Sequence, residues 1–430
     1  MRQEISGFFW ENERVRIQNF LEEDGDVIAE AMKDSTFRMQ AEHGIALPTS
    51  AYDAADFIER ANACLVEGES IWLSICNLRG DIVGYCGLSW IDERAGNLEM
   101  SVTIFPKEQR KGYGRAACEI LLAYAFLERR IHKVNACVLG KNQAGKAFAC
   151  AMGFLVEAER SDMFYTHGRY DSEIYLGLLE REYLGEKTEQ FELDRRLHMR
   201  RGDGVLAADT LTNDSELCKL GEARRTATDS TDNMRLCKLV DAEQLLYDHK
   251  YYWAYEDIIL REMTEEDYMK NHEILLDSMS CRFYDCDVSL PVFSEEPTER
   301  DKEHLRFEGE DGRLEFAVTD QAGNYVGNVN LCGLDQKNGK FSLSIYMIPE
   351  VRGRGYGTKA LKRILSYAFL ELRMHKFITI VNDGNIASET MMKHVGCQVE
   401  GIHRENIYYM GRYVDEIFLG VTKEEFLQAL

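Results

Sequence analysis

The chain has 430 residues, and its 51 Lys and Arg against 74 Asp and Glu give a formal net charge of −23. Such an acidic chain repels the phosphates of DNA and RNA and attracts cationic small molecules or basic peptides, which excludes nucleic acid as an expected partner. The first residues contain no apolar signal segment, and no run approaches the length of a membrane span. We therefore expect a reduced, cytoplasmic protein with no membrane partner.

The first part of the chain predicts short strands around a helical region. A β-branched run over 14–20 predicts a strand, Glu22-Glu23-Asp24 begins a helix, and 27–65 is less regularly helical. Two strands over 71–77 and 82–92 are joined by a turn that contains Gly80. A third strand over 97–105 ends at Pro106 and leads into a glycine-rich loop.

A helix over 115–130 begins after this loop, with an expected apolar face of Ile120, Leu121, Tyr124 and Leu127. A strand over 133–139, a helix over 143–152 that ends at Gly153, and two strands around Gly168 follow. This order predicts an α+β domain: a mixed, mainly antiparallel sheet flanked by helices, with the loop between a strand and a helix.

The same series of elements occurs twice. Gln109 to Gly114 corresponds to Arg352 to Gly357, and a shift of 243 residues (355 − 112) superimposes both halves without a gap. About 26 of the 65 residues that begin at Gly112 are identical to their counterparts, far above chance. We predict two copies of one domain, over 8–183 and 249–430, and a partly helical connector over 184–248.

The loop has the properties of a pyrophosphate cradle. Its glycines allow backbone N–H groups to converge on the phosphate oxygens, and the following helix adds positive potential at its N-terminus. Lys111 and Arg354 add positive charge. The loop lacks the Gly-x-Gly-x-x-Gly of a dinucleotide-binding fold and the Gly-Lys-Ser/Thr of a P-loop.

These residues resemble the GCN5-related N-acetyltransferase (GNAT) superfamily, and within it the spermidine/spermine and ribosomal-protein N-terminal acetyltransferases. The resemblance covers both copies and is carried by Pro106–Gly114, Tyr124-Ala125-Phe126, His132-Lys133, Asn142, Gly153-Phe154, Gly168-Arg169-Tyr170 and their counterparts Pro349–Gly357, Tyr367-Ala368-Phe369, His375-Lys376, Asn385, Gly396 and Gly411-Arg412-Tyr413. It implies two tandem GNAT-like domains, acetyl-CoA as the acetyl donor and an amine as the acceptor.

The resemblance also implies which residues bind the cofactor. The strand that ends at Phe105 or Ile348 would hold the pantetheine arm, and the loop amides would hold the pyrophosphate. The implied residues are Phe105, Gln109, Arg110, Lys111, Gly112, Tyr113, Gly114 and Asn142 in the first copy, and Ile348, Arg352, Gly353, Arg354, Gly355, Tyr356, Gly357 and Asn385 in the second. The asparagines have an alternative role as helix N-caps.

Each copy keeps a different part of the family's catalytic set. Glu99 lies where the relatives place a base, whereas Ser342 is its counterpart; an exposed strand carboxylate is the alternative for Glu99. Ser388 matches a serine of the ribosomal-protein subgroup, and Gly145 is its counterpart. The family's tyrosine acid is replaced by Ala149 and Met392. Four other tyrosines either replace the missing tyrosine as the acid or are core or sheet-surface residues: Tyr165, Tyr170, Tyr408 and Tyr413. His132 and His375 are expected to have a structural role at the end of the preceding helix.

The expected acceptor is a primary amine of a small cationic metabolite or a protein N-terminus, bound near 34–53 or 277–296. The alternative is a CoA-binding sensor or scaffold in which one or both copies are silent. Fusion would pair the two domains within one chain, so the expected oligomeric state is either a monomer or a homodimer. No cluster has metal-ligand spacing, so we predict no metal. Cysteines in apolar runs are expected in the core: Cys76, Cys86, Cys137 and Cys150.

Overall fold

The computed structural model describes residues 8–42, 51–67, 70–186, 190–201, 252–275, 313–409 and 411–430. The chain forms two compact units, each taken by itself below. The first contains Met1–Glu192 and Gly401–Glu416, and the second contains Leu193–Glu400 and Ile417–Leu430. The expected acceptor segment 277–296, and the part of the connector between 202 and 250, lie outside the described residues.

The first unit is built on a mixed sheet. Its strands are β1 (Val15–Gln18), β2 (Ile71–Asn77), β3 (Ile82–Asp92), β4 (Asn97–Ile104), β5 (Lys133–Leu139), β6 (Leu155–Thr166) and β7 (Arg169–Leu179), in the spatial order β1-β2-β3-β4-β5-β7-β6. The β4–β5 pair is parallel, and the other pairs in this series are antiparallel. The expected mixed, mainly antiparallel sheet is confirmed.

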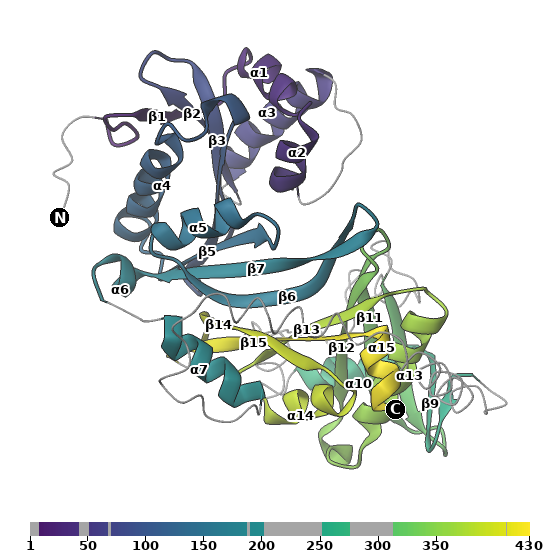
Figure 1. Ribbon diagram of the computed structural model, residues 1–430. Coiled ribbons are helices and arrows are strands. Elements are labelled where there is room, and N and C mark those ends of the chain that lie inside the picture. Colours follow the sequence, from purple (N-terminus) through teal and green to yellow (C-terminus); the bar gives the residue numbers. More distant parts are fainter. Residues whose placement is uncertain are drawn as a thin grey trace, which may run out of the picture. The chain divides into compact units, whose positions relative to one another are not determined.

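Helices cover both faces of this sheet (Figure 1). One face carries α1 (Asp24–Ala31), α2 (Ser35–Glu42) and α3 (Ala51–Glu67), and the other carries α4 (Tyr113–Ala123). The short helices α5 (Gln143–Ala151) and α6 (Glu180–Tyr183) follow β5 and β7, and α7 (Gln190–Arg201) comes next in the chain. The predicted loop between β4 and α4 therefore lies at a strand-to-helix connection.

Strand alternation divides the first unit into two apolar clusters. Leu73 and Ile75 of β2 pack with Ala117 and Leu121 of α4 in the main core. Trp72 points to the opposite face and packs with a second cluster beneath α1 to α3. Because successive side chains of a strand point to opposite faces, this sequence places apolar residues on both sides of β2 and so requires helices on both.

The second unit repeats this plan. Its strands are β8 (Ala254–Tyr255), β9 (Ile258–Glu262), β10 (Leu314–Asp320), β11 (Tyr325–Asp335), β12 (Lys340–Met347), β13 (Lys376–Asn382), β14 (Gln398–Tyr409) and β15 (Arg412–Thr422), in the order β14-β15-β13-β12-β11-β10-β9-β8. The β12–β13 pair is parallel, as is its counterpart in the first unit. Most of β14 and the beginning of β15, Gly401–Glu416, belong to the first unit.

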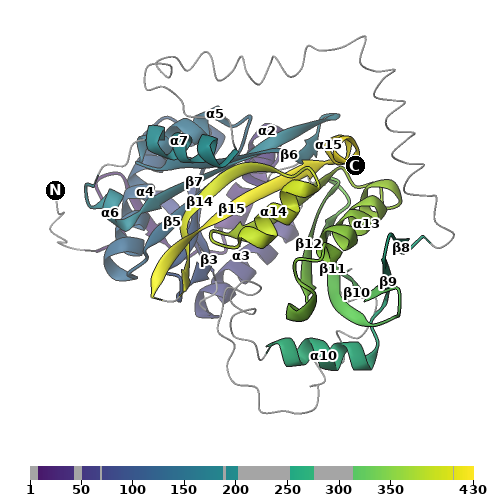
Figure 2. The same cartoon turned by 90° about the horizontal axis from the view of Figure 1, so that it is seen from below.

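Among the described residues, the helices of the second unit are α10 (Glu265–Leu275), α13 (Tyr356–Leu370), α14 (Ile386–His394) and α15 (Lys423–Ala429), together with α7 from Leu193 on. Phe316 of β10 contacts Trp253, which in turn contacts Tyr367 of α13. The neighbouring Ala317 points the other way and packs with Tyr268 of α10. α13 and α10 therefore cover opposite faces of this sheet, as Figure 2 shows.

Two expectations about side-chain burial were wrong. The helix that begins at Tyr113 changes after Ala123 into one π-helical turn, Tyr124–Glu128. Phe126 is buried and Leu127 is 52% exposed, and the regular helix α13 of the second unit buries Phe369, the counterpart of Phe126, in the same way. Cys150 is exposed and Cys137 only half-buried, whereas Cys76 and Cys86 are buried as expected. Within the described ranges, no helix is long and apolar enough to cross a membrane.

Candidate active site

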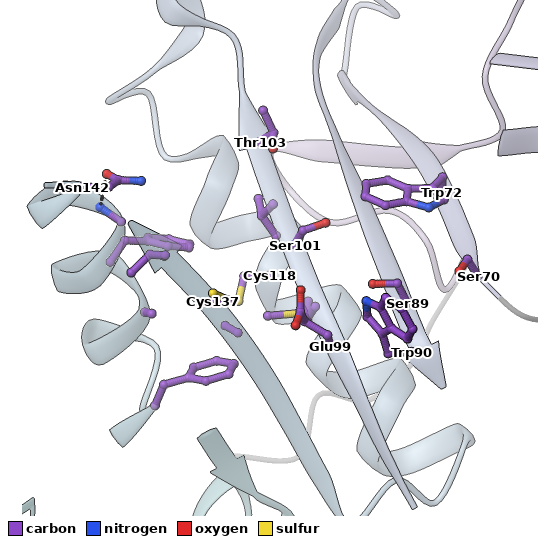
Figure 3. Close-up of a pocket in the computed structure, with 18 of the residues that line it drawn as sticks. Ser70, Trp72, Ser89, Trp90, Glu99, Ser101, Thr103, Cys118, Cys137 and Asn142 are labelled. Carbon is purple, nitrogen blue, oxygen red and sulfur yellow. Dashed lines mark hydrogen bonds between the residues drawn. The ribbon is translucent and has the colours of Figure 1, made fainter. Parts of the chain in front are cut away.

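The parallel strands of each unit part soon after they pair. β4 pairs with β5 only over Asn97–Glu99, and β12 pairs with β13 only over Lys340–Phe341. Beyond these residues the backbone groups along the opening lack a neighbouring strand and remain available to a ligand. In the first unit, a cavity of about 900 Å³ lies at this opening, lined by residues of β2 to β5 and α5 (Figure 3).

Glu99 lies in this cavity at the point where the strands part. Its side chain is half-buried, and it lies opposite Ser89 of β3. Burial, and secondarily the charge of Glu173, raise the pKa of its carboxyl above the ordinary value. The alternative of an exposed strand carboxylate does not describe this environment, in which a half-buried carboxyl with a raised pKa lines a cavity.

The two glycine-rich loops have closely similar backbones. Gly112 and Gly355 are the N-caps of α4 and α13, with φ of +88° and +83°. This left-handed conformation disfavours other residues, so the glycine is required by the turn. The first N–H groups of each helix lack partners within the helix and point out of its N-terminus. They form the kind of site that binds a phosphate.

Side chains within each glycine-rich loop hold the loop in position and add charge beside it. Gln109 donates a hydrogen bond to the carbonyl of Ile104 (3.1 Å), and its counterpart Arg352 donates to that of Met347 (2.9 Å). Arg110 adopts φ of +62°, where the second copy has Gly353 at +77°. Lys111 pairs with Glu108 at the surface (2.9 Å), so its ammonium lies beside the loop.

Other predicted cofactor residues lie near the loop but have additional structural contacts. Phe105 is buried in the cluster beneath α1 to α3, and Ile348 packs with the corresponding cluster of the second unit. Tyr113 packs against the main core at the start of α4. A ligand at the opening would therefore meet the backbone of Phe105 and Ile348 rather than their whole side chains.

Both asparagines cap a helix. The Asn142 side chain accepts a hydrogen bond from the Gly145 N–H (2.9 Å), and Asn385 accepts one from the Ser388 N–H (3.2 Å). The N-cap alternative is thus observed in both copies. Asn142 also lines the cavity, and one face of its side chain remains directed there (Figure 3). Ser388 lies half-buried in the first turn of α14.

The cavity contains residues that the sequence analysis did not select. Trp72 lies directly over Gly87, where an added Cβ would be 2.6 Å from the indole. Trp90, Asp92 and Ser101 also line the cavity. The buried Ser101 hydroxyl has no hydrogen-bond partner within the part of the chain that the structure describes. None of the tyrosines considered as substitute acids lines this cavity: Tyr165, Tyr170, Tyr408 and Tyr413.

The corresponding face of the second unit has different polar groups. Ser342 lies opposite Cys332, as Glu99 lies opposite Ser89. Glu315, the counterpart of Trp72, is only 8% exposed and accepts a hydrogen bond from Asn328 (3.0 Å). This buried carboxylate was also missed, because its strand position becomes informative only when the two sheets are aligned.

His132 has the structural role expected for it. Its ring stacks on Tyr413 with centroids 3.5 Å apart, and its Nε2 lies 2.9 Å from a Glu405 oxygen. Burial alone would raise the pKa of Glu405, but hydrogen bonds from His132 and Arg181 outweigh it and hold that pKa well below its usual range. These contacts lie within the first unit, since Gly401–Glu416 belongs to it.

A buried ionic cluster lies beside this contact. Lys133 and Glu157 form an ion pair (2.7 Å) that is inaccessible to solvent. Arg404 binds Glu157 and Glu182 at 2.7 Å each and is 4% exposed. Across the residues for which coordinates are described, no group of three or more His, Cys, Asp or Glu is placed to hold a metal ion.

Comparisons with known proteins agree with this geometry. The family described as "Acetyltransferase (GNAT) domain" matches residues 14–155 and again 257–398. An uncharacterized prophage-derived N-acetyltransferase of Bacillus subtilis, YokL, is 29% identical over 179 residues, which cover 41% of this chain and 95% of that protein.

A spermidine N(1)-acetyltransferase of Escherichia coli is 26% identical over 110 residues, covering 26% of this chain and 59% of that protein. Among solved structures, the spermidine N-acetyltransferase of Vibrio cholerae with CoA and spermine is 21% identical, covers 40% of this chain and 98% of that one, and has a TM-score of 0.36.

Proposed function

Because this chain belongs to the GNAT acetyltransferase family, with two matched domains, we propose that it transfers an acetyl group from acetyl-CoA to a primary amine. The acceptor is the amine of a small cationic metabolite or a protein N-terminus. The observation that carries the proposal is Glu99, a carboxylate with a raised pKa that lines the cavity where β4 and β5 part. The family does not favour the alternative of a silent CoA sensor.

In this proposal the loop amides hold the pyrophosphate, and the opening beside β4 holds the pantetheine arm. The helix N-termini after Gly112 and Gly355 supply the N–H groups and the positive potential. The negative charge of the chain disfavours an anionic ligand at long range, so this local positive site has to provide the attraction.

The amine must lose a proton before it attacks, because its ordinary pKa is about 10.4. Glu99 accepts that proton, and its raised pKa makes it a better base near neutral pH than an exposed carboxylate. The nitrogen then attacks the thioester carbonyl carbon, and the C–S bond breaks. The second proton released by the nitrogen neutralises the departing thiolate, so the step balances without a tyrosine at Ala149.

The proposal is tested by steady-state acetylation with a panel of amines on wild type, Glu99→Gln and Ser342→Ala. We expect Glu99→Gln to lower kcat/KM by about 10²-fold or more, since general-base catalysis contributes on that order. Ser342→Ala, the matched change in the second copy, should leave the main activity in place. A wild type that acetylates no amine, or a Glu99→Gln variant with full activity, would contradict the proposal.

Thermal unfolding distinguishes lost chemistry from lost folding. A carboxyl with a raised folded-state pKa destabilises the fold once the pH exceeds its unfolded value, because the folded state then resists ionisation. Glu99→Gln removes this cost. The variant should therefore unfold at the same or a higher temperature than wild type at neutral pH.

A further inference from the structure

Trp90 combines two properties that are unfavourable for folding. Its indole is 80% exposed, and its backbone φ is +52°, in the left-handed region that residues with a large side chain rarely adopt. The position lies in an irregular part of the β3–β4 pairing, between Ser89 and Asp92. Such bulges often redirect a side chain near a functional site.

The second copy shows which residue this backbone conformation favours. The counterpart of Trp90 is Gly333, which has φ of +60°. The left-handed conformation is thus occupied by glycine, which favours it, in the second copy and by a large aromatic residue in the first. Exposure of an indole on a strained backbone is best explained by something that it binds.

The cavity indicates the chemistry of that ligand. Trp90 lies next to Ser89, which is directly opposite Glu99, and all three line the same cavity (Figure 3). Asp92 lines it as well, so the indole is accompanied by two carboxylates. An exposed aromatic face with nearby negative charge attracts an ammonium group and the methylene chain that carries it.

We propose that Trp90 determines acceptor specificity in the first copy by holding the second cationic group of a small di- or polyamine whose reacting amine lies at Glu99. This inference rests on the proposed function and narrows its acceptor from any primary amine to a small polycation. An acceptor with a single amine would reach Glu99 without using the indole.

The test is calorimetric titration of spermidine, and separately of butylamine, into the full chain saturated with CoA. For Trp90→Gly we expect the Kd for spermidine to rise about two- to fivefold, the loss of one cation–π contact at an exposed indole. Butylamine should bind equally to both proteins. Trp90→Phe, which keeps an aromatic face, should retain most of the affinity.

Arg130→Gly is the matched control. Arg130 also has a left-handed backbone (φ +54°), but it does not line the cavity. Both glycine variants should unfold at the same temperature as wild type or a higher one, because glycine favours a left-handed backbone, and Arg130→Gly should leave the Kd unchanged. An unchanged Kd for spermidine in Trp90→Gly, or an equal loss for butylamine, would overturn the inference. Spermidine binding that depends on Trp90 without any acetylation would instead contradict the proposed function alone.

Discussion

The two copies keep one backbone and differ in the side chains on the sheet face next to the opening between the parallel strands. The turns at Gly112 and Gly355 have nearly the same φ, and both parallel pairs separate after a few residues. By contrast, Glu99 and Trp72 in the first copy correspond to Ser342 and Glu315 in the second. The proposed cofactor loop is thus retained, whereas the expected acceptor face has changed.

This difference indicates that the loops and the sheet face are constrained by different requirements. A phosphate cradle depends on backbone N–H groups and left-handed turns, so few sequences satisfy it. An acceptor site depends on side chains, which substitution changes without altering the fold. Duplication therefore leaves the loops alike, and the faces that meet the acceptor become free to diverge.

A left-handed position within β6 and its counterpart within β14 show the same divergence in a structural role. Ser161 and Asp162 of the first copy correspond to Arg404 and Glu405 of the second, and both Asp162 and Glu405 have left-handed backbones. Arg404 and Glu405 are the pair that binds Glu157, Glu182 and His132 within the first unit. Stability should therefore depend much more on Arg404 and Glu405 of β14 than on their counterparts in β6.

The largest effect is expected for Arg404→Met. This change leaves Glu182 and Glu157 buried with one cation fewer, and breaking a buried ion pair in this way costs about 3–5 kcal/mol. Denaturant unfolding measures the loss. Ser161→Ala, the matched change at an exposed serine, should alter the free energy of unfolding far less. Equal effects of the two variants would show that the two positions are equivalent.

A smaller effect is expected for Glu405→Gln, at about 1–3 kcal/mol for the loss of charge-assisted hydrogen bonds. The low folded-state pKa of Glu405 means that its contribution is present above the unfolded pKa and is lost as the pH falls. The stability gap between wild type and variant should therefore be full at neutral pH and shrink on acidification below about pH 4.5. A gap that is constant with pH would contradict this assignment.

The fold was largely predictable because strand alternation and turn residues are local signals. The strands at Ile71–Asn77, Ile82–Asp92 and Lys133–Leu139 have the predicted bounds. Burial was less predictable, since the end of a helix can place either of two neighbouring apolar residues in the core, and the structure buries Phe126 and exposes Leu127. The contacts of Arg404 join residues more than 200 positions apart, and no pattern in the sequence predicts them.

The candidate site divides in the same way. The loop and Glu99 were found from spacing and resemblance, whereas Trp90 was missed because its exposure and left-handed backbone are properties of the structure. One signal was present in the sequence: the counterpart of Trp90 is Gly333, and a glycine in one copy marks a position where the other copy's tryptophan is unusual.

The most direct test is calorimetric titration of acetyl-CoA into wild type, Gly112→Glu and Gly355→Glu. Gly80→Glu and Gly323→Glu are matched controls, because they place the same charge at a left-handed glycine of a hairpin turn in each copy. We expect two sites in wild type, each abolished by its own loop variant and unaffected by the controls. No binding in wild type, or binding that survives both loop substitutions together, would contradict the account.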